Sequence, residues 1–248
     1  MPHVFDGLKT SQRKVLYACF KKKLTKDIKV AQLAGYIGEH SAYHHGEQSL
    51  HSTIIGMAQN YVGTNNINLL FPSGQFGTRR MGGKDHASAR YIFTRLEKIT
   101  RAIFHPDDDK LLTYLNDDGL NVEPEFYMPV IPMLLVNGCQ AIGTGWSSTV
   151  PQFNPREIIS NLRKLIRKEE PDEMHPFNNG WMGELECNSK GGYKFKGKIR
   201  RKNETTLVIT ELPVGKWTTD YKTFLEGLMT SDEKKDSDIE DVLENHSE

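Results

Sequence analysis

An arginine and a tyrosine stand side by side at Arg90 and Tyr91, inside a stretch rich in glycine and in cationic residues. The phenolic oxygen of tyrosine has an ordinary pKa of about 10, and a fixed cation beside it eases its deprotonation. The same guanidinium can stabilise the charge that grows on a phosphoryl group in a transition state. The pair is therefore a candidate for phosphoryl-transfer chemistry. The run YIFT leaves a second interpretation open, in which Tyr91 is a half-buried strand residue.

The residues just before this pair are suited to binding an anion. Four glycines between residues 74 and 83 allow a backbone to approach a ligand closely. Charge is also distributed unevenly: residues 1–101 contain 15 Lys and Arg against 6 Asp and Glu, whereas residues 102–248 contain 17 against 26. Such a division predicts an anion-binding half carried on an acidic support. The cations of the glycine-rich stretch itself are Arg79, Arg80 and Lys84.

Composition indicates a soluble globular protein. Hydrophobic residues make up 37% of the 248 residues and charged residues 26%, which is typical of a folded domain and not of a disordered one. No apolar run approaches the roughly 20 residues of a membrane span, and the N-terminus does not resemble a secretory signal. Since the three cysteines are far apart in the sequence, we expect reduced thiols and an intracellular location. They are Cys19, Cys139 and Cys187.

Helical periodicity in the first sixty residues predicts the elements that position the Arg–Tyr pair. A first helix should start with Thr10 or Ser11 as its N-cap, and two more should cover residues 28–39 and 46–61. Helix, short turn and helix form the helix-turn-helix arrangement, which can place its second member in a DNA groove. We expect a strand at residues 66–71, the glycine-rich loop and the strand carrying Tyr91 to form a wing beside these helices.

The remainder should be built mainly of strands. Prolines and glycines interrupt short apolar runs between residues 122 and 155, which predicts strands and turns there and no helix. An amphipathic helix should follow at residues 155–168, and alternating polarity predicts antiparallel strands between residues 181 and 213. The acidic tail from Ser231 should be mobile and exposed.

Taken together, these stretches resemble the breakage-reunion core of the eukaryotic type IIA DNA topoisomerases. Their order and spacing match that family over nearly the whole chain. An isoleucine directly after the tyrosine is similar to the eukaryotic branch, because bacterial gyrases and topoisomerase IV carry a threonine there. The matching stretches are FDGLKTSQRKVLY, KVAQLAG, YHHGEQSL, AQNYVGTNNINLL, GQFGTR, GGKD, ARYIFTRL, VEPE, IGTGWS and ITELP.

The resemblance implies a mixed α+β fold. A helix-turn-helix winged-helix domain that cleaves DNA is expected over residues 1–105, followed by part of an α/β tower domain with a β-rich sheet over residues 106–230. Residues 231–248 would be an acidic segment inside the truncated tower. The family's ATPase and Toprim domains would precede this fragment.

The resemblance also assigns roles to residues. Tyr91 would attack a DNA phosphodiester and remain joined to the 5′ end, while Arg90 clamps the phosphate. One of His44 and His45 would help to position that phosphate, although the residues alone are more typical of histidines in a turn or helix cap. Ile142, flanked by small residues, would wedge between base pairs, unless it is an ordinary core isoleucine. Contacts to the DNA backbone and groove edge would come from Lys9, Arg13, Lys14, Gln75, Thr78, Arg79 and Lys84.

The implied partners and cofactors belong to a larger protein. The resemblance implies double-stranded DNA as the substrate, a homodimer, a nuclear location and no membrane. Mg²⁺ would be bound by the Toprim domain and ATP by the ATPase domain, so that the present segment holds neither and is inactive without them. Two other functions stay open: a winged-helix domain that binds DNA without a covalent link, and a different tyrosine-nucleophile enzyme such as a recombinase.

Overall fold

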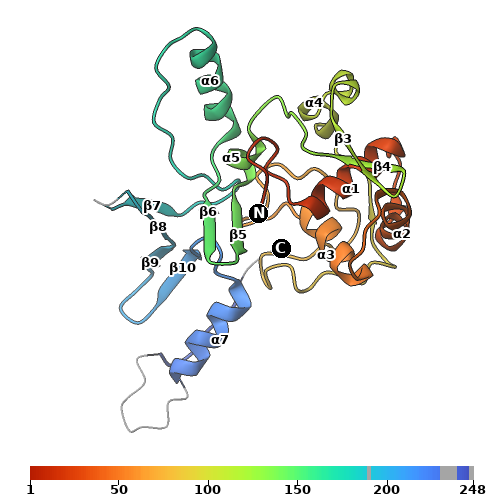
Figure 1. Cartoon of the computed structure of the whole chain (residues 1–248). Coiled ribbons are helices and arrows are strands. Elements are labelled where there is room, and N and C mark those ends of the chain that lie inside the picture. Colours follow the sequence, from red (N-terminus) through yellow and green to blue (C-terminus); the bar gives the residue numbers. More distant parts are fainter. Residues whose placement is uncertain (189–190, 230–238, 246–248) are drawn as a thin grey trace. The chain divides into compact units, whose positions relative to one another are not determined.

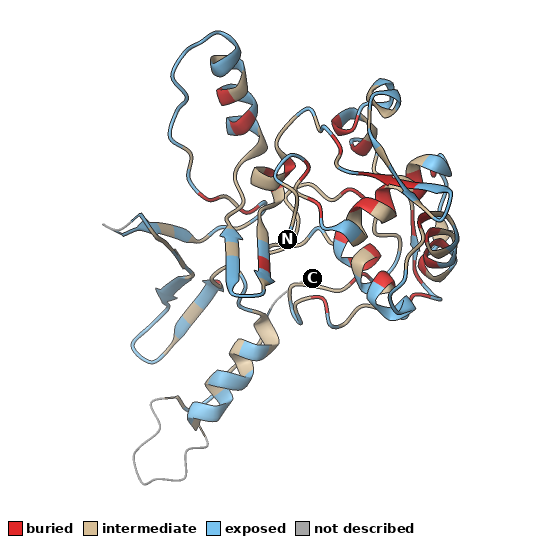
Figure 2. Ribbon diagram, viewed as in Figure 1, coloured by how far each residue is buried: buried red, intermediate tan, exposed pale blue. Residues whose placement is uncertain are grey.

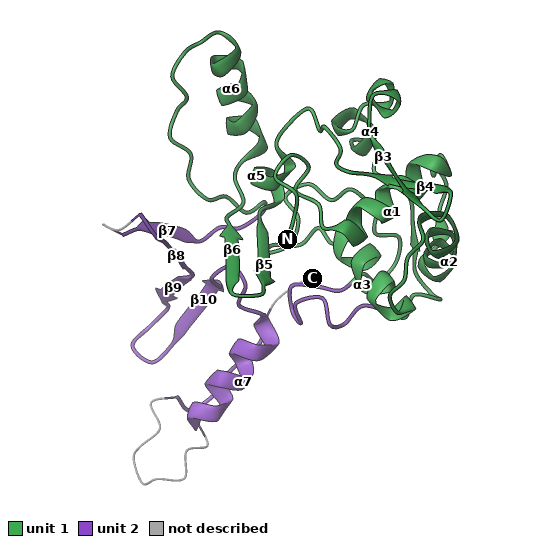
Figure 3. Ribbon diagram, viewed as in Figure 1, with its two compact units in different colours: residues 1–76, 87–179 green, residues 77–86, 180–248 purple. Residues whose placement is uncertain are grey.

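The computed structural model describes residues 1–188, 191–229 and 239–245. These residues form two compact units, one of residues 1–76 with 87–179 and the other of residues 77–86 with 180–248 (Figures 1 and 3). The domain boundary expected near residue 105 stays a prediction. Most of the acidic tail from Ser231, expected to be mobile, lies outside the described residues. No helix in the part that the structure describes is long and apolar enough to cross a membrane.

Three amphipathic helices open the first unit: α1 (Thr10–Lys21), α2 (Val30–Ser41) and α3 (Glu47–Ala58). Leu16, Leu33 and Ile54, one from each helix, are completely buried in a shared core, and buried positions concentrate here (Figure 2). The predicted N-cap of the first helix is wrong. Lys9 is the N-cap residue, and its backbone N–H donates to the Gln12 side chain at 2.9 Å.

A small sheet packs beside these helices. Strand β1 (Ile28–Lys29) pairs with β2 (Phe93–Thr94) in antiparallel register, so α2 starts two residues later than the sequence predicted. The strand expected at residues 66–71 is reduced to a single bridge between Leu70 and Leu96. The backbone N–H groups of Leu69 and Leu70 both donate to the Met57 carbonyl, at 3.2 and 3.4 Å, and are therefore not available to a strand ladder. The Asn66 side chain anchors the start of the segment on the carbonyl groups of Val136, Phe153 and Phe177.

The rest of the first unit consists of short helices and hairpins. Two elements, α4 (Thr100–Ile103) and η1 (Pro106–Lys110), lead into the hairpin of β3 (Tyr114–Asp117) and β4 (Leu120–Pro124). A second hairpin, β5 (Cys139–Gly143) with β6 (Trp146–Val150), precedes helix α6 (Pro155–Ile166). The expectation of no helix between residues 122 and 155 is wrong. Helix α5 (Met133–Asn137) forms there because Met133 and Val136 bury one face of it.

The second unit contains the predicted antiparallel strands. Strand β7 (Glu184–Cys187) pairs with β8 (Tyr193–Lys196), and β9 (Lys198–Arg201) pairs with β10 (Leu207–Glu211). Helix α7 (Thr218–Met229) follows.

A buried ion pair ties the start of the chain to α1. The Asp6 side chain is fully buried and bonds Arg13 through both carboxylate oxygens, at 2.8 and 3.1 Å. The same carboxylate accepts from the backbone N–H groups of Leu8 and Tyr127, each at 2.9 Å. Because each of its oxygens accepts two hydrogen bonds, this buried charge is well compensated.

We predict that Arg13→Ala lowers the free energy of unfolding by about 3–5 kcal/mol, because it leaves the Asp6 carboxylate buried without its cation. Urea denaturation followed by circular dichroism measures the effect. Lys9→Ala, at an exposed position of the same segment, is the matched control and should change stability by less than about 0.5 kcal/mol. An equal, small change in both variants would contradict the role given to the pair.

Candidate functional site

Arg90 and Tyr91 lie in a turn between two anchored residues. Ala89 and Ile92 are buried, at 7% and 1% exposure, whereas Tyr91 is 73% exposed and Arg90 is also exposed. The Tyr91 backbone N–H donates to the Ser88 carbonyl at 2.8 Å, which closes the turn. Strand β2 begins only at Phe93, so the strand predicted to carry Tyr91 in the wing starts after it, and the interpretation of Tyr91 as a half-buried strand residue is wrong. Its neighbours fix the backbone while its own side chain reaches solvent.

The first turn of α2 holds this segment in place. The backbone N–H of Val30 donates to the Ile92 carbonyl at 3.0 Å, and that of Ala31 donates to the Ala89 carbonyl at 3.1 Å. These two carbonyls flank the Arg–Tyr pair, so the positive end of the α2 dipole lies against the turn. A helix N-terminus favours negative charge nearby, which suits a site that receives a phosphate.

Side-chain contacts around β2 add to this anchoring. Arg95 bonds Asp27 at 2.5 Å and lies 3.7 Å from the centre of the Phe71 ring, and the Ser73 hydroxyl donates to the same carboxylate at 3.0 Å. The hydrogen bond from Arg95 holds the pKa of the Asp27 carboxyl below its usual value. Arg95 therefore ties the strand to Asp27 and Phe71.

Tyr91 differs from the other tyrosines in its exposure. All nine tyrosines fall in the described part of the chain, and the remaining eight are buried or half-buried. Burial, for example, raises the pKa of Tyr127 well above its ordinary value. Tyr91 is thus the one exposed tyrosine of the described residues, and the phenol most accessible to a macromolecular substrate.

The histidine pair lies between α2 and α3. His44 is 77% exposed and its Nε2 lies 3.1 Å from Asp117, while the His45 ring is exposed and packs against Tyr43 at 5.4 Å. Neither side chain caps α3, whose N-cap residue is Gly46. Both imidazoles are exposed in the turn before α3, and His44 directs one ring nitrogen to Asp117.

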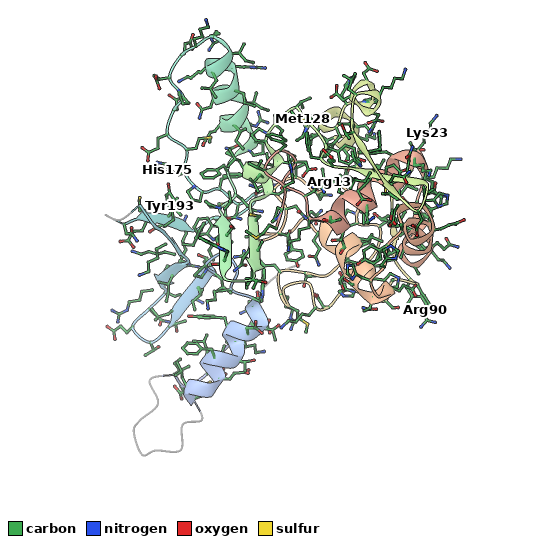
Figure 4. All side chains as sticks on the ribbon, in the orientation of Figure 1. Arg13, Lys23, Arg90, Met128, His175 and Tyr193 are labelled. Carbon is green, nitrogen blue, oxygen red and sulfur yellow. The ribbon has the colours of Figure 1, made fainter. Side chains whose placement is uncertain are left out.

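The structure separates the predicted DNA-binding residues of the first unit into two kinds. The Arg13 side chain is buried and forms an ion pair with Asp6. Figure 4 labels Arg13 among the inner side chains and Arg90 at the margin. Lys14 donates to Glu123 at 2.7 Å and to the Ser41 carbonyl, and its side chain is 13% exposed. Both cations thus already have buried carboxylate partners in this structure, and the phosphate contacts expected of Arg13 and Lys14 stay predictions. Lys9 and Gln75 are exposed.

The glycine-rich loop, residues 77–86, belongs to the second unit. Thr78 donates to Asp85 through its backbone N–H at 2.9 Å and its hydroxyl at 2.6 Å. Partial burial opposes ionisation of Asp85, but these hydrogen bonds outweigh it and hold the pKa of this carboxyl below its usual value. Arg79 bonds Glu211 at 2.5 Å, whereas Lys84 is exposed. Of the three predicted contacts here, Lys84 is the one that presents its charge to solvent.

Ile142 lies near the tip of the β5–β6 hairpin, opposite Ser147. Its side chain is 86% exposed, so the alternative of an ordinary core isoleucine is wrong. Trp146, next to the turn of the same hairpin, is 79% exposed, and we did not single it out from the sequence. Its opposite residue is Gly143, one position on from Ile142, so the two apolar side chains point to opposite faces of the hairpin.

The described residues do not bring together three or more His, Cys, Asp or Glu side chains that could hold a metal ion. The cysteines are free, and burial raises the pKa of the Cys19 thiol to about 12.

Comparison with known proteins finds relatives among the type II DNA topoisomerases and their subunits. The family model for the A subunit of DNA gyrase/topoisomerase IV matches residues 1–248. DNA topoisomerase 2 of Pisum sativum is 59% identical over 93% of this chain and 16% of its own length, and that of Candida albicans is 54% identical over 100% and 17%. A crystal structure of the Plasmodium falciparum topoisomerase II DNA-binding, cleavage and re-ligation domain matches with a TM-score of 0.93 at 55% identity, covering 94% of this chain and 32% of that one.

The present chain thus spans about a sixth of the length of these curated relatives. The mixed α and β architecture with small antiparallel sheets, expected from the sequence, is confirmed by the structural match. With the family model matching from end to end, the chain belongs to the family of DNA gyrase/topoisomerase IV A subunits, and its relatives named above are eukaryotic type II topoisomerases.

Proposed function

We propose that this chain is the DNA-cleavage module of an ATP-dependent type IIA DNA topoisomerase. The whole enzyme would break both strands of one duplex, pass a second duplex through the gap and reseal it, which relaxes supercoils and separates linked DNA. The observation that carries the proposal is the exposed Arg90–Tyr91 turn, held by buried neighbours against the first turn of α2. This turn combines a reachable nucleophile, a fixed cation and a rigid backbone.

The chemistry follows from these groups. The Tyr91 oxygen loses its proton and attacks a backbone phosphorus, an oxygen–phosphorus bond to tyrosine forms, and the bond to the 3′ oxygen breaks. The 3′ oxygen takes up a proton, and the 5′ phosphate stays on Tyr91. Because the phosphotyrosine diester conserves the energy of the broken bond, the 3′ hydroxyl can reseal the strand by the reverse reaction. Arg90 would steady the phosphate through charge-assisted hydrogen bonds, and His44 or His45 would orient it.

The remaining parts of the activity are assigned to other regions of the whole protein. The resemblance to the family assigns Mg²⁺ to a Toprim domain, where it would stabilise the leaving oxygen. ATP is assigned to an ATPase domain. The functional enzyme would be a nuclear homodimer acting on double-stranded DNA. The alternative is a winged-helix domain that binds DNA without a covalent link, and the α2–α3 pair is equally compatible with it.

We predict that Tyr91→Phe abolishes covalent attachment to DNA and leaves duplex affinity within about twofold, because only the nucleophilic oxygen is removed. The chain is mixed with a suicide DNA substrate, Mg²⁺ and a Toprim-containing partner segment, and 5′-linked protein is detected on denaturing gels. Tyr43→Phe, which removes the hydroxyl of a half-buried tyrosine, is the matched control and should still form adducts. Adducts with the Tyr91 variant would refute the assignment; none with the unaltered chain would favour the non-covalent alternative.

We predict that Lys84→Ala lowers the slope of log affinity against log salt by about one, because one exposed phosphate-binding cation is lost. Fluorescence anisotropy with several unrelated duplexes at graded salt measures the slope. The comparison variant is Lys14→Ala, whose cation is held by Glu123: it should lower stability and leave the slope unchanged. The reverse pattern would show that Lys14, and not Lys84, meets the phosphates.

We predict that Ile142→Ala reduces bending of bound DNA by about 20° or more, because a wedging side chain is lost. Energy transfer between dyes at the duplex ends reports the angle. Ile166→Ala, on α6 at 81% exposure, is a control of equal chemistry and should leave the angle unchanged. Both variants should keep the stability of the parent chain within about 0.5 kcal/mol. An unaltered bend in the Ile142 variant would rule out the wedge.

A further inference from the structure

The segment that follows strand β10 packs against the glycine-rich loop within the second unit. The strand ends within ITELP, residues 209–213, a stretch that carries part of the family resemblance and has no role in the chemistry above. We infer that Glu211 is a positioning residue for the loop: it anchors Arg79 so that Lys84 is presented to a nucleic-acid backbone. This inference rests on the DNA-binding role proposed above for the loop.

The Arg79–Glu211 pair is built as an anchor. The Arg79 guanidinium donates to Glu211 at 2.5 Å and to the Leu212 carbonyl at 2.9 Å. The Glu211 side chain is 6% exposed, and its second oxygen accepts from the Met182 backbone N–H at 2.9 Å. A buried carboxylate fixed by backbone donors holds an arginine in one geometry. Arg79 therefore directs its guanidinium to a carboxylate of the protein, and its role as a direct phosphate ligand stays a prediction.

Two further contacts hold the loop on the same segment. The Thr219 backbone N–H, at the start of α7, donates to the Arg80 carbonyl at 3.0 Å. The Trp217 indole fills the space beside Gly82, where a Cβ atom would lie only 2.4 Å from the ring. Gly82 also has a φ of +60°, a conformation that favours glycine. Residues 211–219 thus contact the loop at Arg79, Arg80 and Gly82.

Contacts inside the loop complete its shape. Gly77 lies so close to Gly83 that a Cβ atom on Gly77 would approach the Gly83 Cα to 2.5 Å. The Gly83 backbone N–H donates to the Thr78 carbonyl at 3.0 Å, and Asp85 accepts the two hydrogen bonds from Thr78. Lys84 therefore projects from a loop that is closed on itself and anchored from outside. A preorganised cation loses less conformational entropy when it binds.

Trypsin tests the anchor without reference to DNA, because it cleaves after the basic residues of the loop only when the loop opens. Glu211→Gln keeps the shape of the side chain and removes its charge, and we expect cleavage after Arg80 and Lys84 to rise about tenfold. Arg79→Gln breaks the same pair from the loop side and should give a similar rise, and the double variant should add little to either. Glu204→Gln, an exposed carboxylate in the same unit, is the matched control and should cleave like the parent. Cleavage after Arg201, in β9, reports any general loosening of the unit.

The outcomes separate the anchor from the proposed function. Loop cleavage that rises in both single variants, with Arg201 unaffected, supports the anchor. If duplex affinity falls in the same variants, the anchor serves to present Lys84 to DNA. Unchanged affinity would contradict the DNA-binding role of the loop but not the anchoring of Arg79 by Glu211. If Glu211→Gln also raises cleavage after Arg201, loop cleavage in the Arg79→Gln variant is the measurement that tests the anchor. Parent-like loop cleavage in the Arg79 variant would overturn the inference.

Discussion

The structure around the candidate nucleophile depends on two backbone hydrogen bonds. The first two N–H groups of α2, those of Val30 and Ala31, have no hydrogen-bond acceptor within the helix. They donate to the carbonyl groups of Ile92 and Ala89. This satisfies the helix terminus and at the same time fixes the chain on both sides of Arg90 and Tyr91. One set of contacts therefore stabilises the helix and fixes the backbone of the site. It also brings the positive end of a helix dipole to the place where a phosphate would arrive.

Positive charge in this chain serves two purposes that the sequence does not distinguish. Arg13, Lys14 and Arg79 each pair with a buried carboxylate and hold elements together. Lys84 and Arg90 are exposed. A buried carboxylate that lost its cation would carry a large desolvation cost, so these pairs are not readily exchanged for a phosphate. The basic excess of the first hundred residues is therefore only partly available to an anionic partner.

The hairpin of β5 and β6 shows how strand geometry selects a functional side chain. Alternation along the strand buries Ala141 at 7% exposure and leaves Ile142 at 86%. A shift of one residue in register would exchange the two faces. Antiparallel pairing from Cys139–Val150 to Gly143–Trp146 fixes the register, and it makes an exposed isoleucine a stable feature of the fold.

The sequence by itself determined the family resemblance, the three N-terminal helices, the strands of the second unit and the identity of Tyr91 as the residue to examine. Periodicity and motif spacing are local properties, and a linear sequence retains them in full. It could not determine where α2 begins, that residues 66–71 form no strand, that residues 133–137 form a helix, or which cations are free. Only the tertiary structure decided these points, because each depends on a partner distant in the chain: Phe93 for Lys29, Met57 for Leu69, Glu123 for Lys14 and Glu211 for Arg79.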